Sequence, residues 1–318
     1  MPELRRNIPP QVLVATHRRL PDFRPVTPDD VEVIAPYLRY SGSRSCDFTI
    51  GGIFMWVDYF GYEYCIYRDT LFIKGLSEDE SRQPAFSLPM GKLPLREALA
   101  AIREYCRAER IEPLFSAIPE ERVDDFRALG ARAVTELPDW ADYVYNAAEL
   151  ASLTGKHYNK KRNHVNRFMS DNPGWRLDDI DGSNIGELID FFAALDIESA
   201  KAEPAMAEFE REQCLDVLRD YDRYGMSGAL LRDGNGHIVA FTAGELRGDT
   251  LVLHIEKMRH DVAGAGETVN RFFAARMLER HPELLYINRE DDAGDPGLRY
   301  AKESYHPIYK LKKYNVVL

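Results

Sequence analysis

The chain has 318 residues, of which 45% are hydrophobic and 29% are charged, a composition that excludes a disordered chain. At about 150 residues per domain this length predicts roughly two domains. No apolar run approaches the ~20 residues of a transmembrane helix, and the first residues hold no apolar core like that of a signal peptide. We therefore expect a soluble, cytoplasmic protein. The four cysteines form no CxxC pair, which predicts neither a disulfide framework nor a cysteine zinc site.

The formal net charge of −11 argues against a general nucleic-acid binder, but basic residues are concentrated in two segments. Residues 156–167 hold five basic residues and no acidic one, and residues 299–313 hold five basic residues and one acidic one. A concentrated positive site on an acidic protein favours an anionic ligand bound at one place. We predict that the two segments border one cleft; two separate solvated surfaces are the alternative.

The first half of the chain reads as a loop-rich segment to about Ser45, followed by strands and two helices. The predicted elements are strands at Glu63–Tyr67 and Thr70–Lys74, a helix over Pro94–Arg110, a strand at Leu114–Ile118, a helix over Glu120–Leu129, and strands near Ala133–Leu137 and Tyr143–Tyr145. The helix over Pro94–Arg110 is predicted because apolar residues recur at three- and four-residue spacing after Pro94, a residue type that suits the first turn of a helix.

The second half begins with a basic helical segment at 154–169 and then repeats the same plan. The predicted elements are helices at Ile185–Ala200 and Ala205–Tyr221, strands at Met226–Arg232, His237–Leu246 and Thr250–Met258, a helix over 264–280, a strand at Leu284–Asn288, a helix at Leu298–Tyr305, and a last strand at Tyr309–Val317. Glycine-containing turns join the three strands, as hairpins require.

Both halves therefore run as a meander of antiparallel strands followed by helix, strand, helix, strand, and this order predicts a tandem duplication. The expected fold class is α+β, with one domain over residues 1–150 and a second over residues 151–318. Mixed, mostly antiparallel sheets of this order, flanked by helices, are typical of N-acyltransferases of the GNAT type, although a fold alone does not define a function.

Three segments of the second half carry an unusual density of polar residues. They are Leu153–Phe168, His254–Lys257 and Tyr286–Pro307. With Tyr143–Tyr145 and Gly244-Glu245, they closely resemble the family of the C-terminal domain of phosphatidylglycerol lysyltransferase. The matching residues are Gly155-Lys156, Lys160–His164 and Phe168; His254–Lys257; and Asn288–Asp292, Gly294, Gly297–Arg299, Ala301-Lys302, Ser304-Tyr305 and Pro307.

The resemblance spans nearly the whole chain and implies two tandem GNAT-like domains, the second carrying the active site. Relatives in the family transfer an aminoacyl group from a charged tRNA to a lipid head group, and related peptidyltransferases load amino acids onto peptidoglycan precursors. It thus implies an aminoacyl-tRNA donor and a small-molecule, peptide or lipid head-group acceptor. This chain lacks the membrane-spanning module of the lipid enzyme, so the acceptor stays open.

Three residues are the catalytic candidates. Glu256, on a predicted strand and expected on the same face as His254, could accept a proton or hold an amine. Asn288 and Glu290 follow a strand expected to be parallel to that of Glu256, at the edge where α/β sheets bind ligands. We expect all three to converge on one pocket. A structural ion pair of Glu256 with Lys257 or Arg299, and a helix-capping role for the acids after Asn288, are the alternatives.

A second group of candidates would bind phosphate or substrate through charge-assisted hydrogen bonds. Its members are Lys156, Lys160, Lys161, Arg162, His164, Arg167, Lys257, Asp292, Arg299 and Lys302. A solvated helix face is the alternative for the basic residues. No metal is predicted, because His254-x-Glu256 is not followed by the cysteine pair of a zinc deaminase.

The turn Asp261–Gly266 could cradle the pyrophosphate of acetyl-CoA at a helix start. Gly264 and Gly266 fit that pattern, but Asp261 stands where a basic or amide residue is expected and would repel pyrophosphate. An acyl-CoA-dependent N-acyltransferase is therefore the second hypothesis. A non-catalytic module that binds a phosphorylated ligand is the third.

Overall fold

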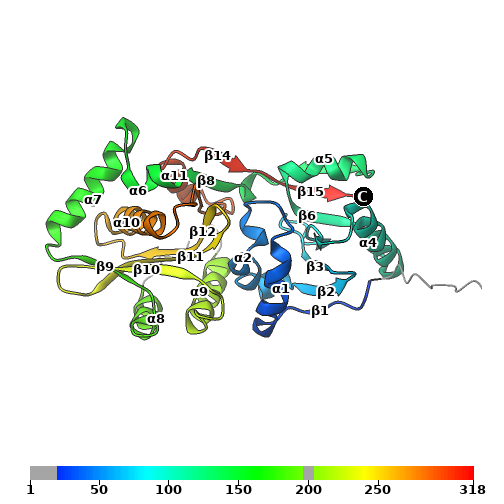
Figure 1. Cartoon of the computed structure of the whole chain (residues 1–318), viewed down its shortest axis with the longest axis horizontal. Coiled ribbons are helices and arrows are strands. Elements are labelled where there is room, and N and C mark those ends of the chain that lie inside the picture. The colour runs from blue at the N-terminus through cyan, green and yellow to red at the C-terminus, as the bar shows by residue number, and fades with distance from the viewer. Residues whose placement is uncertain (1–19, 196–203) are drawn as a thin grey trace, which may run out of the picture.

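The computed structural model describes residues 20–195 and 204–318, and these form two sheets that follow one another along the long axis of the molecule (Figure 1). The α+β class and the mixed, mostly antiparallel sheets expected from the sequence are confirmed. The end of the helix predicted over Ile185–Ala200 lies outside the described residues.

The first sheet has the strand order β1-β2-β3-β4-β6-β15-β7, with β5 beside β3. Its strands are β1 (Arg24–Pro25), β2 (Glu63–Tyr67), β3 (Thr70–Leu76), β4 (Pro84–Phe86), β5 (Met90–Gly91), β6 (Leu114–Pro119), β7 (Ala133–Glu136) and β15 (Lys313–Val317). The helices around it are α1 (Val31–Leu38), α2 (Ile50–Phe54), α3 (Val57–Phe60), α4 (Leu95–Glu109) and α5 (Glu120–Ala128). The prediction of a loop-rich segment to about Ser45 is wrong for residues 31–38, which form α1. This helix buries Ile34 and Leu38, although Pro36 lies inside it.

The second sheet has the order β14-β8-β13-β12-β11-β10-β9. Its strands are β8 (Asp142–Asn146), β9 (Arg176–Asp179), β10 (Ser227–Arg232), β11 (Ile238–Arg247), β12 (Thr250–Met258), β13 (Tyr286–Asn288) and β14 (Tyr309–Leu311). The helices are α6 (Ala147–Ser152), α7 (Asn159–Asp171), α8 (Ile185–Ala194), α9 (Pro204–Arg219), α10 (Ala265–Arg280) and α11 (Pro296–Glu303). Figure 1 shows α10 on one face of this sheet and α8 and α9 on the other.

The apolar core does not stop between the two sheets. One cluster of buried side chains joins Leu71 and Phe115 of the first sheet to Ile255 of the second sheet and to Phe192 of α8 and Leu218 of α9. A second cluster lies between the other face of the second sheet and α6 and α10. Because burial of apolar surface is the main favourable term in folding, the continuous cluster binds the two halves into one packed unit.

The last strand of each half belongs to the sheet of the other half. Strand β8 lies between β14 and β13 in the second sheet, whereas β15 lies between β6 and β7 in the first. The single strand expected over Tyr309–Val317 is therefore wrong: it divides at Lys312 into β14 and β15. The expected division near residue 150 follows the sheets except at these two strands, which cross between them (Figure 1).

Candidate functional site

The parallel strands β12 and β13 part in the middle of the second sheet. Residues Thr250–Val252 pair with Tyr286–Asn288, after which β13 ends while β12 continues to Met258. We call the point where the two strands separate the opening. It lies at the carboxyl ends of two parallel strands, where α/β sheets bind ligands. The parallel pairing predicted for Asn288 is thus confirmed, and the motif residues 289–292 follow directly after the point where the two strands separate.

A β-bulge interrupts β12 at His254. Ala243 pairs with Ile255 and Gly244 pairs with Leu253, so His254 has no partner residue on β11. A bulge adds one residue and shifts the alternation of side chains. His254 consequently contacts Gly51 of α2, whereas Glu256 contacts Asn270 of α10. The expectation that His254 and Glu256 share a face is therefore wrong.

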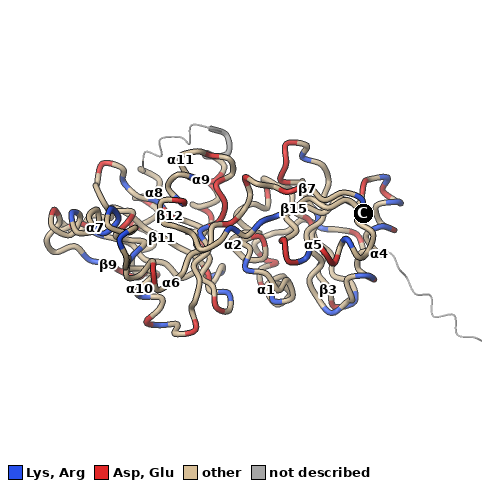
Figure 2. Tube along the Cα trace, turned by 90° about the horizontal axis from the view of Figure 1, so that it is seen from above, with Lys and Arg blue, Asp and Glu red and all other residues tan. Residues whose placement is uncertain are grey.

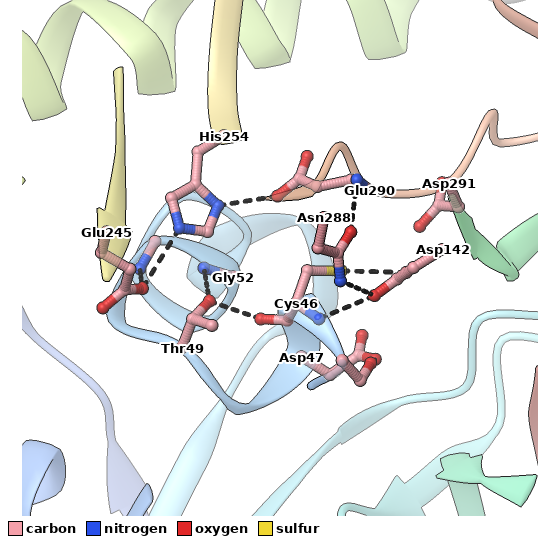
Figure 3. A network of polar contacts seen from close by, with 12 residues as sticks. Cys46, Asp47, Thr49, Gly52, Asp142, Glu245, His254, Asn288, Glu290 and Asp291 are labelled. Atoms are coloured by element: carbon pink, nitrogen blue, oxygen red, sulfur yellow. Dashed lines mark hydrogen bonds and ion pairs between the residues drawn. The ribbon is translucent and has the colours of Figure 1, made fainter. Parts of the chain in front are cut away.

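His254 lies fully buried between two carboxylates (Figure 3). Its Nε2 is 3.1 Å from Glu245 Oε1, and its Nδ1 is 2.7 Å from Glu290 Oε1. Burial alone lowers the pKa of the imidazole, but the hydrogen bonds and charges of Glu245 and Glu290 raise it to about 10. A Cβ on Gly51 would lie 2.3 Å from the ring, so only glycine allows α2 to approach this closely. His254 is an imidazolium at neutral pH and serves as a donor, not as a base.

This assignment predicts a pH dependence of stability. The folded protein holds one proton more than the unfolded chain between pH ~6.5, the ordinary histidine value, and pH about 10. The stabilisation from His254 is therefore complete below pH ~6.5 and is lost as the pH rises through that window. Denaturant unfolding of the wild type and of His254→Gln should show a difference that shrinks from pH 6 to pH 10. A difference independent of pH would contradict a charged imidazole.

Asn288 joins the opening to the boundary between the two halves. Its Nδ2 donates to Asp142 Oδ2 at 2.7 Å and to the carbonyl oxygen of Arg44 at 2.8 Å, and its Oδ1 accepts from the Glu290 backbone at 2.7 Å. Glu290 has φ +58, a left-handed conformation that costs energy for a residue other than glycine. The bonds from Asn288 and His254 hold Glu290 in this conformation, with its carboxylate about one-fifth exposed.

Lys313, the first residue of β15, lies at the crossing of the two exchanged strands and is fully buried. Its Nζ is 2.8 Å from Asp142, 2.9 Å from Asp47 and 3.5 Å from Asp291. Burial and the neighbouring acids raise the pKa of Asp291 to about 6, although Lys313 opposes this. Cys46, Asp142 and Asp291 have ligand atoms within 4.8 Å of one another, and the Lys313 ammonium supplies the positive charge among them.

Glu256 belongs to a separate polar cluster on the α10 side. Its carboxylate accepts from Arg289 Nε at 2.7 Å and from Asn270 Nδ2 at 2.8 Å. The sequence missed Arg289 as its partner, although the signal was present: Arg289 directly follows Asn288 and alternation turns it to the other face. Asn288 and Glu290 instead contact Asp142 and His254, so the structure divides the three catalytic candidates between two clusters.

Most of the basic candidates are already engaged within the protein. In the first basic segment, Lys161 and His164 lie near Glu267, Arg162 donates to the carbonyl oxygens of Leu153 and Gly155, and Arg167 pairs with Asp171. Lys257 forms an ion pair with Glu210. In the second segment, Arg299 forms ion pairs with Asp292 and Asp139, and Lys302 donates to the carbonyl oxygen of Asp291. Lys156 and Lys160 are exposed and have no polar partner among the described residues.

The two basic segments touch where Tyr158 donates to the carbonyl of Tyr305 and Lys161 lies 3.8 Å from the centre of the Tyr305 ring. Figure 2 shows Lys and Arg distributed over both halves of the molecule, with α7 at the end farthest from the C-terminus. A shared cleft between the two basic segments remains a prediction. The acidic partners given in the preceding paragraph already neutralise much of the positive charge expected there.

The glycine turn before α10 lies under α7. Gly264 has φ +80, and a Cβ on it would lie 2.2 Å from the carbonyl oxygen of His164. Asp261 forms an ion pair with Arg259. The backbone of α7 thus lies against the turn that would bind the pyrophosphate of an acyl-CoA. Close packing against α7 is sufficient to explain why residue 264 is glycine, without a ligand.

Comparisons with known proteins agree with this architecture. A protein of unknown function from Bacteroides thetaiotaomicron is 31% identical, with a TM-score of 0.82 over 94% of this chain and 99% of that one. L-PGS from Bacillus licheniformis shares the fold at 14% identity and a TM-score of 0.62, over 94% and 92% of the two chains. FemX does so at 9% identity and a TM-score of 0.59, over 93% and 97%. No curated protein has a matching sequence.

The α+β fold with two mostly antiparallel sheets flanked by helices is therefore confirmed. Within the described ranges, no helix has the length and apolar character needed to cross a bilayer. The family model described as "Phosphatidylglycerol lysyltransferase, C-terminal" matches residues 38–317, which include every motif discussed above. The chain belongs to the family of the phosphatidylglycerol lysyltransferase C-terminal domain.

Proposed function

We propose that this protein is a transferase that moves an aminoacyl group from aminoacyl-tRNA to an amine or hydroxyl acceptor, in the cytoplasm where charged tRNA is found. The observation that carries the proposal is the position of Asn288–Asp292, a segment that resembles the family and lies within the matched residues, at the point where β12 and β13 separate. Ligands of α/β sheets bind at such openings.

The transfer requires a proton to leave the acceptor as its new bond to the carbonyl carbon forms, and a proton to reach the ribose oxygen as the ester bond breaks. Glu290 is the partly exposed carboxylate at the opening and is held by His254 and Asn288. We assign Glu290 the role of general base, which takes the proton from the acceptor. The resulting carboxyl group can then act as general acid and give this proton to the leaving ribose oxygen. The His254 imidazolium holds the Glu290 carboxylate in position through the 2.7 Å contact between Nδ1 and Oε1.

Phosphate binding is assigned to Lys156 and Lys160, the exposed basic candidates without a partner in the described part of the chain. If both contact phosphates of tRNA, the slope of log affinity against log salt should fall in magnitude by about 1.4–1.8 when both become glutamine, because each contact contributes about 0.7–0.9. Filter binding from 50 to 300 mM salt, roughly the range over which such effects are measured, gives both slopes. An unchanged slope would place the tRNA elsewhere.

The direct test is a transfer assay with radiolabelled aminoacyl-tRNA and a panel of amine, alcohol, peptide and lipid acceptors. Parallel titrations with acetyl-CoA and with uncharged tRNA separate the remaining hypotheses. Transfer of label supports the proposal. Binding and turnover of acetyl-CoA would establish an acyl-CoA enzyme, and binding of a phosphorylated ligand without turnover would indicate a non-catalytic module.

A further inference from the structure

The first half contains an opening between parallel strands like that of the second half. Strands β4 and β6 are parallel and pair only at Phe86 and Phe115. Beside this pair is a cavity of about 30 Å³, lined by Asp47, Glu78 and Ser116 together with the apolar Ile53, Ile73 and Phe86. Ala117, which also lines it, has φ +56, and strained backbone of this kind concentrates at functional sites.

Glu78 is the unusual residue of this cavity. It is 8% exposed, and its Oε2 has no hydrogen-bond partner among the residues that the structure describes. A buried polar atom without a partner costs free energy unless a ligand or an ordered water satisfies it. Burial, followed by the neighbouring Asp47 carboxylate, raises the pKa of Glu78 well above its ordinary value, while Lys313 opposes the shift.

The surroundings of Glu78 hold more acidic groups than basic ones. Asp47, Asp142 and Asp291 share Lys313 as their only ion-pair partner within the described part of the chain, and Glu78 has no ion pair there. A cation in the cavity would balance these carboxylates and satisfy Glu78 Oε2. Hard divalent cations require about six oxygen ligands, which apolar walls of isoleucine and phenylalanine cannot supply. The same walls suit the carbon chain of an organic cation.

We propose that this cavity binds a primary alkylammonium group, with Glu78 and Asp47 facing the nitrogen and the apolar side chains contacting its first carbons. At about 10–15 Å³ per water-sized group, the cavity holds the nitrogen and one or two carbons, and the rest of the ligand extends outward. The group could belong to a small amine or to the side chain of an amino acid. This proposal does not rest on the proposed transfer reaction, because amine binding is tested without tRNA.

The test is calorimetric titration of the full-length protein with propylamine, 1-propanol and propionate at constant ionic strength and pH 8. Propylammonium should bind at least tenfold more tightly than the other two, since neither provides a positive charge of the same size. Lysine amide and 1,3-diaminopropane, titrated in the same way, distinguish an amino-acid side chain from a simple amine. Equal binding of propylamine and propanol, or binding of neither, would show that the cavity does not select a positively charged nitrogen, and would overturn the proposal.

Two variants localise the binding. Glu78→Gln keeps the shape of the protonated acid and should lower propylamine affinity at least tenfold, whereas Glu80→Gln, at an exposed position two residues away, should leave it unchanged. Ala85→Val, which narrows the cavity without changing its charge, provides a second test if Glu78→Gln unfolds, and thermal melting reports on folding. Full affinity in folded Glu78→Gln or Ala85→Val protein would place the amine elsewhere and refute the assignment.

The binding should also release protons. Glu78 faces Asp47, Asp291, Tyr62 and Lys313, and an entering ammonium would drive its ionisation. Propylamine affinity should therefore rise from pH 6 to pH 8, and the calorimetric heat should depend on the ionisation enthalpy of the buffer. Affinity that is flat over this range would contradict the exchange of a proton for the ammonium.

Discussion

Replacing Lys313 with methionine is expected to lower the free energy of unfolding by about 3–5 kcal/mol, the usual result of removing one partner of a buried ion pair. The variant leaves Asp47, Asp142 and Asp291 without their shared cation at the crossing of β8 and β15. Urea or guanidinium unfolding measures the change. Lys312→Met is the matched control, because Lys312 is about two-fifths exposed and its pair with Glu136 is on the surface; it should change stability by less than about 0.5 kcal/mol.

The loss in Lys313→Met should be smaller at low pH. Without the ammonium, the buried carboxyls have folded-state pKa values above those in the unfolded chain, so the folded variant binds more protons and its stability rises as the pH falls. Asp142→Asn in the same background should recover part of the loss, because it removes one of the unpaired charges. A loss below about 1 kcal/mol at pH 8 would show that the cluster does not depend on Lys313.

Glu290→Gln is expected to lower aminoacyl transfer by about 10²–10⁴-fold, the scale for a positioned general base. Glu256→Gln provides the comparison on the other side of β12. Because Glu256 neutralises Arg289, whose side chain is about one-tenth exposed, its replacement should lower stability by about 3 kcal/mol and affect transfer less. Paired kinetics and unfolding curves separate the two roles.

The catalytic assignment of Glu256 made from the sequence predicts the reverse result. Glu256→Gln would then fold almost normally and lose transfer by about 10²–10⁴-fold. That outcome would move the reaction centre to the α10 side of the sheet, where Asn270 Oδ1 and Arg289 Nη1 are buried and have no hydrogen-bond partner within residues 20–195 and 204–318.

The sequence by itself determined the features that depend on local pattern. The longer helices, most of the longer strands, the parallel strand before Asn288 and the family motifs are all read over short stretches of chain, where periodicity and turn residues act directly. These suffice for the α+β class, for the tandem halves and for the position of Asn288 and Glu290 at a strand end.

Only the tertiary structure decided which polar groups meet. The alternation of residues 309–317 breaks at Lys312-Lys313, and this local break does not say that β15 pairs in the first sheet. The bulge at His254 depends on pairing with β11, and it turns His254 towards Glu290 and Glu256 towards Arg289. Buried charges require partners, but those partners lie up to 266 residues apart, as for Lys313 and Asp47, and only long-range packing brings them together.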